Sequence, residues 1–522
     1  MSFFARFAQY RERPTRVPSV KPKPLAKSDD AGMQDDHSPR PSPKGTVFAL
    51  AAVLVAALTQ LSDAPTDLAR NAAICVGVGL AGSVLMDLKS GLWNLPRADL
   101  FALLAFYFLT LFEFLFPQAN FNAMTTPDLA RAGLGVVLVG FAGLLIGRHL
   151  LRPKRQPFEH ILTRAVSVGW LIVLFWFSAF VGYLQMLIVV DFNVLKMIEW
   201  FMEPRFTQPW GRGKFGDWKA LLYELSMLLQ LLPPLAGIML ARRRRFPVWH
   251  MVPMIVVVGI TFFAGFASGT RNILASYLVT FLIGYAFALP RERNKELVIL
   301  GSTCALVIVF ATYFMLQFRT VGLRNYLRGN VPVAAADTPM TLYVDYNLHS
   351  ICRLVEIFPN QRAYLGLEIP YLAIIRPIPR AIWKSKPEGM STSIEEAMGA
   401  QGLTIAASFA GEAYMSGGNF AVLLVALGFG AVFGWWSSLA SSRNSELGIL
   451  IYASGFFAAV ISMRSLLVFT TALLPTAAGL IAGTWLVGRV KTSIAKRATT
   501  MNQTPRPRRG PINRYHETNR RP

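Results

Sequence analysis

The chain has little charge and few cysteines. Of its 522 residues, 16% are charged, whereas 53% are hydrophobic and 12% are aromatic. This balance excludes an ordinary soluble globular protein and indicates an integral membrane protein. The three cysteines, Cys75, Cys304 and Cys352, predict no internal disulfide, because the first two lie within apolar stretches. The N-terminal stretch is basic and proline-rich without an apolar core, so no cleavable signal peptide is expected.

Several motifs of well-known enzyme classes are also missing. The sequence has no Asp-x-Asp triplet, no His/Cys cluster with metal-ligand spacing, no Walker phosphate-binding loop and no Gly-x-Ser-x-Gly elbow. The loops expected inside the cell are too short to form a nucleotide-sugar-binding domain. Outside the cell there is no ATP and there are no nucleotide sugars, so a sugar donor used there must cross the membrane already joined to its leaving group. A sugar linked to a polyprenyl diphosphate meets this requirement.

What the sequence does contain is a series of apolar stretches of membrane-spanning length. They predict an all-α, polytopic membrane protein with about 12 transmembrane helices. The expected spans are 46–62, 69–86, 99–117, 129–147, 164–187, 220–240, 251–267, 272–289, 297–316, 418–436, 447–463 and 466–489.

The spacing of these stretches divides the chain into five parts. A long polar segment separates the ninth stretch from the tenth, and a polar loop of that length between apolar helices usually has a functional role. Both ends of the chain are too polar to bury a core, and the first is expected to be disordered. The expected parts are a basic cytoplasmic tail at 1–45, a membrane domain with helices 1–9 at 46–316, a large periplasmic loop at 317–417, a membrane domain with helices 10–12 at 418–489, and a basic cytoplasmic tail at 490–522.

Basic residues predict the orientation of the chain. The formal net charge is +23, and Lys and Arg gather in both tails and at 148–156, 241–246 and 291–295. The loops at 63–68 and 118–128 contain neither residue. By the positive-inside rule, both termini are expected in the cytoplasm and the chain in a bacterial inner membrane. The positive charge is then expected to contact anionic lipid rather than nucleic acid.

A second group of basic residues is expected on the outer side, against this trend. Arg271 and Arg464 lie in very short turns between apolar stretches, so they must lie near the membrane surface. Several such cations would repel one another unless an anion lay between them, and guanidinium groups bind phosphate oxygens in a bidentate manner. For each residue singly, a lipid contact or an ion pair is the alternative. The candidate diphosphate-binding residues are Arg271, Arg319, Arg376, Arg380, Lys384, Lys386 and Arg464.

Three outer residues are candidate catalytic bases. Glu412 is preferred because it lies in a polar setting just before an apolar stretch, with a role in holding an arginine as the alternative. His349 titrates near neutral pH but lies at helical spacing in an amphipathic segment, where an ordinary surface histidine is the alternative. The same alternative applies to Asp345.

Two motifs in the second half of the chain resemble those of the bacterial O-antigen polymerases, the Wzy family of oligosaccharide repeat unit polymerases. The first is Pro-Arg-x-x-Trp-x-x-Lys-Pro at 379–387, and the second is Gly-Glu-x-Tyr-x-x-x-Gly at 411–418. Gly-Thr-Arg at 269–271 looks like the family's turn of small residues followed by arginine. The first half of the chain is similar only in being helical. The resemblance adds Trp383 and Tyr414 to the candidate glycan-binding residues.

The resemblance implies a layout similar to that of the C-type glycosyltransferases and a metal-independent reaction without a cofactor. The expected substrates are undecaprenyl-diphosphate-linked glycans, as donor and as acceptor, which are joined into a surface polysaccharide such as O-antigen, capsule or exopolysaccharide. Expected partners are the lipid bilayer, a chain-length regulator and a flippase. Two alternatives stay open: an O-antigen ligase, which differs in its acceptor, and a polysaccharide or lipid transporter.

Overall fold

The computed structural model describes most of the central part of the chain, including more than half of the long polar segment. The short gaps separate helices, and the longest gap inside the chain falls within 317–417. The described residues are 39–151, 159–163, 166–204, 207–210, 218–290, 293–318, 321–329, 347–378, 383, 385–387, 390, 407–442, 445–482 and 485.

The described residues form helices and no strands. Among the described residues, eight helices or helical stretches are long and apolar enough to cross a membrane, which indicates a multi-pass membrane protein. Four shorter apolar stretches occupy the other predicted spans, so the count of 12 stays a prediction. The eight are α2 (Pro65–Leu88), α5 (Pro127–Gly147), α7 (Val168–Val189), Leu222–Ala241, α11 (Val248–Ala267), α12 (Arg271–Ala288), α13 (Asn294–Phe318) and α18 (Ser408–Ser438); the four are α1 (Pro43–Leu58), α3 (Ala98–Thr110), α19 (Glu446–Ser462) and Leu466–Ala482.

Shorter elements connect the long helices. The stretch Leu222–Ala241 is itself broken, because it joins the end of α9, a 3₁₀ turn and α10, which has two prolines in its first turn. The shorter elements are η2 (Leu92–Asn94), η3 (Phe112–Leu115), α4 (Ala119–Met124), α6 (Glu159–Leu162), α8 (Val194–Phe201), α9 (Trp218–Leu225), η5 (Ser226–Leu231), α10 (Leu232–Ala241), η6 (Arg243–Arg245), α14 (Leu323–Leu327), α15 (Asn347–Ile357), α16 (Glu368–Ile375), η8 (Leu439–Ser442), η9 (Leu466–Val468) and α20 (Phe469–Ala472).

Local sequence signals fix where several of these helices begin. Proline in the first turn opens α1, α2 and α5, where its fixed φ suits the helix and its missing N–H costs no bond. Ser42 caps α1 by accepting from the Gly45 N–H at 3.3 Å, and Ser445 caps α19 by accepting from the Gly448 N–H at 2.9 Å. These hydroxyls satisfy amides that have no partner inside the helix.

Helices α5 and α18 pack with their backbones in close contact. A Cβ on Gly147 would clash with the Leu427 carbonyl of α18, and one on Gly430 would lie 2.5 Å from the Leu144 carbonyl of α5. Small residues at such positions let helices approach closely where lipid supplies no hydrophobic driving force between them. Either glycine replaced by alanine would force this pair of helices apart.

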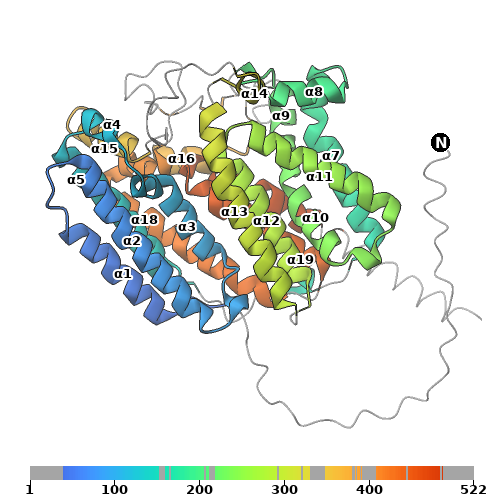
Figure 1. The fold of residues 1–522 in the computed structure, drawn as a ribbon, viewed down its shortest axis with the longest axis horizontal. Coiled ribbons are helices and arrows are strands. Elements are labelled where there is room, and N and C mark those ends of the chain that lie inside the picture. The colour runs from blue at the N-terminus through green and yellow to red at the C-terminus, as the bar shows by residue number, and fades with distance from the viewer. Residues whose placement is uncertain are drawn as a thin grey trace, which may run out of the picture. The chain divides into compact units, whose positions relative to one another are not determined.

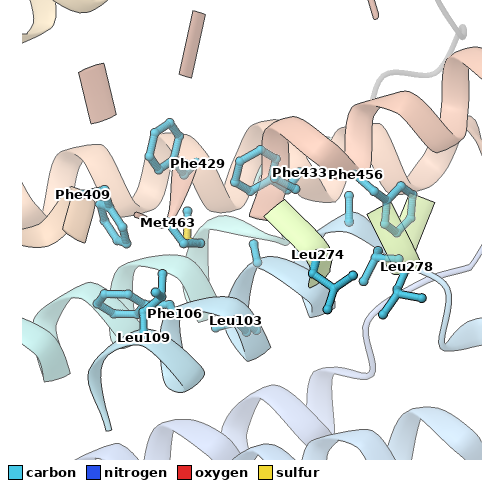
Figure 2. Packing of buried hydrophobic residues seen from close by; sticks show 14 of the residues in the cluster. Leu103, Phe106, Leu109, Leu274, Leu278, Phe409, Phe429, Phe433, Phe456 and Met463 are labelled. Atoms are coloured by element: carbon cyan, nitrogen blue, oxygen red, sulfur yellow. The ribbon is translucent and has the colours of Figure 1, made fainter. Parts of the chain in front are cut away.

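Buried aromatic residues join α3, α12, α18 and α19 into one core, and Figure 2 shows part of it. The Phe106 ring of α3 lies 4.8 Å from the Phe409 ring at the start of α18, and Phe409 lies 5.5 Å from Phe429. Offset and edge-on ring pairs of this kind add to the burial of apolar area. Leu109 and Leu274 belong to the same cluster, so the core reaches the ends of α3 and α12.

Short helices gather at one end of the long ones. In Figure 1, α4, α8, α14 and α15 lie at the same end, which also holds the C-terminal end of α3. Helix α15 packs against α5 and α18, and α16 packs against η9. We call this the outer end, because the sequence predicts that the segment containing α14, α15 and α16 faces outside.

Helix α18 consists of two helical segments that meet at a kink. It starts at Ser408 and has non-helical backbone at Gly417 and Gly418, so the start predicted for the tenth span at 418 coincides with the break. Gly418 has φ +65°, a conformation that favours glycine. Glu412 and Tyr414 lie in the helical segment before the kink, which the sequence did not predict, and the bounds of the predicted loop stay a prediction.

The opposite, inner end of α3 holds a buried network of charges. Arg97 donates to Asp87 at 2.6 Å and to Asp99 at 3.2 Å, and all three side chains are almost fully buried. Arg148 lies 4.0 Å from Asp99, and Ser437 of α18 donates to Asp99 at 2.7 Å. The sequence placed Arg148 among the loop charges that fix orientation, but it is only 1% exposed. Its role here is a buried ionic contact between helices.

The same network holds the chain just before α1 through backbone atoms. Asp87 accepts from the Ser42 N–H at 2.7 Å, and Arg97 donates to the Arg40 carbonyl at 2.9 Å. The Arg40 N–H in turn donates to the Asn94 side chain at 2.6 Å. Residues 40–42 are thus fixed to the inner end of the bundle.

Candidate functional site

A pocket opens at the outer end, where four segments of the chain meet. It is lined by the end of α3, the turn and first residues of α12, the first residue of α15 and the turn after α19. The empty space at this site is about 310 Å³, which includes open solvent at its mouth. The described lining residues are Leu109, Gly269, Thr270, Arg271, Asn272, Asn347 and Arg464.

Arg271 reaches the pocket because a tight turn starts α12 there. Gly269 adopts φ +64°, and Thr270 is the N-cap residue before Arg271, the first residue of the helix. The Arg271 guanidinium lies 5.8 Å from the centre of the Phe108 ring, a cation–π contact. The first turn of a helix carries a partial positive charge from backbone N–H groups with no intrahelical acceptor. Arg271 therefore adds to a positive potential that the helix already supplies.

Arg464 enters the pocket from the turn that follows α19. Its backbone N–H donates to the Ile461 carbonyl at 3.0 Å and closes the turn, and the side chain is half-buried. The preceding residue, Met463, accepts at its carbonyl from the Phe409 N–H at 3.1 Å, so the turn is attached to the start of α18. The structure thus brings together two of the predicted arginines, Arg271 and Arg464, from distant parts of the chain.

The Glu412 carboxylate holds the other side of the Arg464 turn. It accepts from the Ser465 hydroxyl at 2.6 Å and from the Leu467 N–H at 3.1 Å, and the residue is 4% exposed. Arg376, which follows α16, is close enough to interact with it electrostatically. Glu412 does not line the pocket. Its contacts match the alternative in which it positions an arginine, and the role of base stays a prediction.

Three other predicted binding residues stabilise the segment around α16. Lys386 donates from Nζ to the carbonyls of Arg376 and Ile378, both at 2.9 Å, and so fixes the chain that follows α16. The Trp383 indole donates to the Ser385 hydroxyl at 2.9 Å in an exposed position. None of these predicted residues, Arg376, Trp383 and Lys386, is among the described residues that line the pocket.

Tyr414 supports the kink of α18 rather than the pocket. Its hydroxyl donates to the Phe358 carbonyl at 3.4 Å, and its ring packs edge-on against Tyr364 at 6.0 Å. A Cβ on Gly418 would lie 2.8 Å from the Tyr364 hydroxyl, so the glycine lets this tyrosine approach the kink. The described contacts give Tyr414 a packing role, and glycan binding by it stays a prediction.

His349 lies outside the pocket, on the same helix as Asn347. Residues two apart on a helix point in different directions, and the His349 Nδ1 shares a hydrogen bond of 3.0 Å with the Thr125 hydroxyl. Burial and the nearby Arg353 lower the pKa of His349 below 6.5, and Glu356 opposes them. A more weakly basic imidazole bonded to threonine is placed to support α15, and its catalytic role stays a prediction.

The remaining predicted site residues lie outside the described part of the chain. They are Asp345, Arg319, Arg380 and Lys384.

The sequence did not single out Asn347 or Asn272, which line the pocket with the arginines. Asn347 is 3% exposed and Asn272 is 9% exposed. Asparagine carries no charge and fits no spacing rule, so only the three-dimensional arrangement identifies either residue. The one available signal was position: Asn272 directly follows the predicted Arg271.

The described lining residues combine two arginines, polar amides and a helix N-terminus, with no carboxylate among them. Such a set favours an anionic ligand that also carries hydrogen-bonding groups. No group of three or more His, Cys, Asp or Glu side chains that could hold a metal occurs among the described residues.

Comparisons of this chain with protein-family models, with curated proteins and with solved structures gave no match. The choice of function therefore depends on the chain's own residues.

Proposed function

We propose that this protein is a membrane glycosyltransferase that joins undecaprenyl-diphosphate-linked oligosaccharide units into a surface polysaccharide at the outer face of a bacterial inner membrane. One observation carries the proposal: Arg271 and Arg464, which come from two turns far apart in the chain, line the same pocket. A diphosphate that joins a membrane lipid to a sugar is the kind of anion that would reach a site at the end of a membrane bundle.

The pocket's positive groups would bind the donor diphosphate. Guanidinium groups stay charged at any relevant pH and match phosphate oxygens in geometry. The N-terminus of α12 adds its partial positive charge at the same place. Groups fixed in advance around the developing charge lower the barrier to its formation, and this stabilisation is often the largest contribution to catalysis.

In the proposed reaction, a hydroxyl oxygen of the acceptor glycan attacks the anomeric carbon of the donor sugar. A new glycosidic C–O bond forms, the bond between that carbon and the diphosphate breaks, and undecaprenyl diphosphate leaves with the electron pair. The hydroxyl proton passes to a base, for which Glu412, His349 and Asp345 stay predictions. Arg271 and Arg464 stabilise the negative charge that grows on the departing diphosphate.

Glu412 has a positioning role in this scheme. Its carboxylate binds the two residues that flank Leu466 in the turn after Arg464. Holding that turn fixes the direction in which Arg464 enters the pocket. The electrostatic contact with Arg376 would place a third guanidinium next to the same turn.

A transporter is the second candidate, because two membrane helices are broken. The backbone of α18 is non-helical at Gly417 and Gly418, and the stretch from α9 to α10 passes through a 3₁₀ turn at Ser226–Leu231. Transporters build substrate sites from such discontinuous helices. A ligase would differ from the polymerase only in its acceptor.

The glycolipids of a deletion strain separate the three functions. Loss of a polymerase leaves single repeat units on the final acceptor, loss of a ligase leaves long polymer on the lipid diphosphate, and loss of a transporter leaves units trapped inside the cell. The polymerase proposal expects the first profile, and either of the others would overturn it.

Variants of the pocket arginines then test the site in the complemented strain. Arg271→Gln and Arg464→Gln should each reduce polymer at least about 100-fold, since losing one group that stabilises the transition state typically costs that much, while the protein still inserts. Arg131→Gln is the matched control, because Arg131 pairs with Asp128 at 2.8 Å on the surface. Full polymer in both pocket variants would refute the proposal.

A further inference from the structure

One side chain that lines the pocket, the amide of Asn347, has a polar atom that a diphosphate would not pair with. Asn347, the first residue of α15, lines the pocket next to Arg271 and Arg464 and is 3% exposed. Its Nδ2 donates to the Leu109 carbonyl at 2.8 Å. Its Oδ1 is buried and has no hydrogen-bond partner among the described residues.

The direction of this amide is fixed by its neighbour. The Leu109 carbonyl can only accept a hydrogen bond, so the amide must turn its NH₂ group toward it. The Asn347 oxygen is thereby left as a buried acceptor on a residue that lines the pocket. Native structures satisfy nearly all buried polar atoms, and an exception at a site indicates a missing partner.

The missing partner must be a hydrogen-bond donor. Diphosphate oxygens are themselves acceptors and carry negative charge, so they would be repelled by an amide oxygen. A sugar hydroxyl can donate, and in a glycosyl diphosphate the sugar ring is joined directly to the phosphate. The two arginines would bind the phosphate oxygens, and the Asn347 oxygen would accept a hydrogen bond from a sugar hydroxyl. The set therefore matches a sugar attached to a phosphate.

We infer that Asn347 binds a hydroxyl group of the sugar attached to the diphosphate, and that the pocket thereby distinguishes a glycosyl diphosphate lipid from the bare lipid diphosphate. This inference depends on the proposed function, and it adds a specificity residue to it. After transfer, the product lipid diphosphate lacks the sugar and so binds less tightly, which favours its release.

A purely structural role for Asn347 is the competing explanation. Leu109 is near the C-terminal end of α3, where carbonyls have no intrahelical partner, so the asparagine can serve as a cap. A cap would change stability but would not distinguish between ligands.

The test measures binding of two probes to the purified full-length protein in lipid nanodiscs. The probes are farnesyl diphosphate and farnesyl-diphosphoryl-N-acetylglucosamine, and the variants are Asn347→Leu and Arg464→Gln. Asn325→Leu is the control, because the Asn325 side chain also donates to a backbone carbonyl, that of Val321 four residues earlier at 2.9 Å, but Asn325 is not among the described residues that line the pocket.

Asn347→Leu should weaken binding of the sugar-bearing probe about fivefold, the value of one neutral hydrogen bond, and leave the bare diphosphate unchanged. Arg464→Gln should weaken both probes, and Asn325→Leu neither. If Arg464→Gln weakens both but Asn347→Leu affects them equally or not at all, the inference fails and the proposed function stands. If wild type binds neither probe, or Arg464→Gln changes neither, the proposed function itself fails.

A second measurement uses only the wild-type protein, so it does not depend on the folding of a variant. Wild-type protein is titrated with probes whose sugar lacks one hydroxyl at a time. At least one deoxy probe should lose about fivefold in affinity, because its hydroxyl is the donor to Asn347. Equal affinity for every deoxy probe would overturn the inference.

Discussion

Arginine side chains at the two ends of α3 have opposite surroundings. At the inner end, Arg97 bonds two carboxylates, Asp87 and Asp99, and every one of these side chains is sealed from solvent. At the outer end, Arg271 and Arg464 line an open pocket whose described lining contains no carboxylate. One end encloses its ion pairs within the bundle, and the other places arginines and asparagines in the wall of a pocket.

This difference indicates a separate role for each end. A buried ion pair adds little net stability, but removing one member leaves an uncompensated charge, so the inner network specifies how the helices meet. Arginines in the wall of a pocket are placed to contact an anion that enters it. Stability should therefore depend most on the inner end, and activity most on the outer end.

Breaking the inner network should give the largest effect. Asp99→Asn removes the carboxylate next to Arg97 and Arg148, and the free energy of unfolding should fall by about 3–5 kcal/mol, the usual cost of a buried charge left without its partner. Thermal unfolding of the purified protein, together with its yield, measures the change.

Asp128→Asn is the control for this variant. It breaks an exposed pair with Arg131 at 2.8 Å, where the expected change is only about 0–1 kcal/mol. Equal losses in the two variants would contradict the distinction between the two ends.

An intermediate effect is expected for Glu412→Gln. This variant distinguishes a role of Glu412 in positioning Arg464 from a role in folding alone. Glu412→Gln replaces an acceptor of two bonds by a group that satisfies one, so stability should fall by about 1–3 kcal/mol. Polymer formation should fall further than this loss explains, because the Arg464 turn is released. Both quantities are measured on the same preparations.

A double variant tests how Glu412 acts. If it works only through Arg464, then adding Glu412→Gln to Arg464→Gln should lower activity no further, because both changes disable the same element. An additive loss would instead support the predicted role of Glu412 as base.

The smallest effect concerns His349, at the outer end but outside the pocket. Its pKa in the folded protein lies below 6.5, so the unfolded chain binds a proton more readily. The stability it contributes is complete above pH 6.5 and is lost as the pH falls toward the folded-state pKa. Melting temperatures at about pH 5 and about pH 8 should differ less in His349→Gln than in wild type. An unchanged difference would place the pH sensitivity elsewhere.

Much of the helical framework follows from the sequence, because lipid imposes a simple rule on apolar length. The stretches predicted at 129–147 and 251–267 match α5 and α11 closely. The start predicted at 418 coincides with the break at Gly417 and Gly418. The helical segment before this break was not predicted, because it lies in a stretch too polar to read as a membrane span.

The site was predictable only in part, and for a physical reason. Arg271 and Arg464 stand out because a cation in a short outer turn opposes insertion. Arg148 carries the same charge but follows a helix at the basic inner end, so the sequence gives no sign of its burial. Asn347 has no charge, and its importance comes from the single carbonyl that orients it.

The attachment of residues 40–42 has a consequence for how the N-terminal segment can vary. The bundle binds this part of the chain through its backbone, by hydrogen bonds to the Ser42 N–H and the Arg40 carbonyl. These bonds join backbone atoms, so inserting or deleting one residue there would shift the donors and acceptors out of register whatever the side chains are. The entry of the polypeptide into the bundle is therefore specified by the spacing of its peptide groups, together with the Ser42 hydroxyl that caps α1.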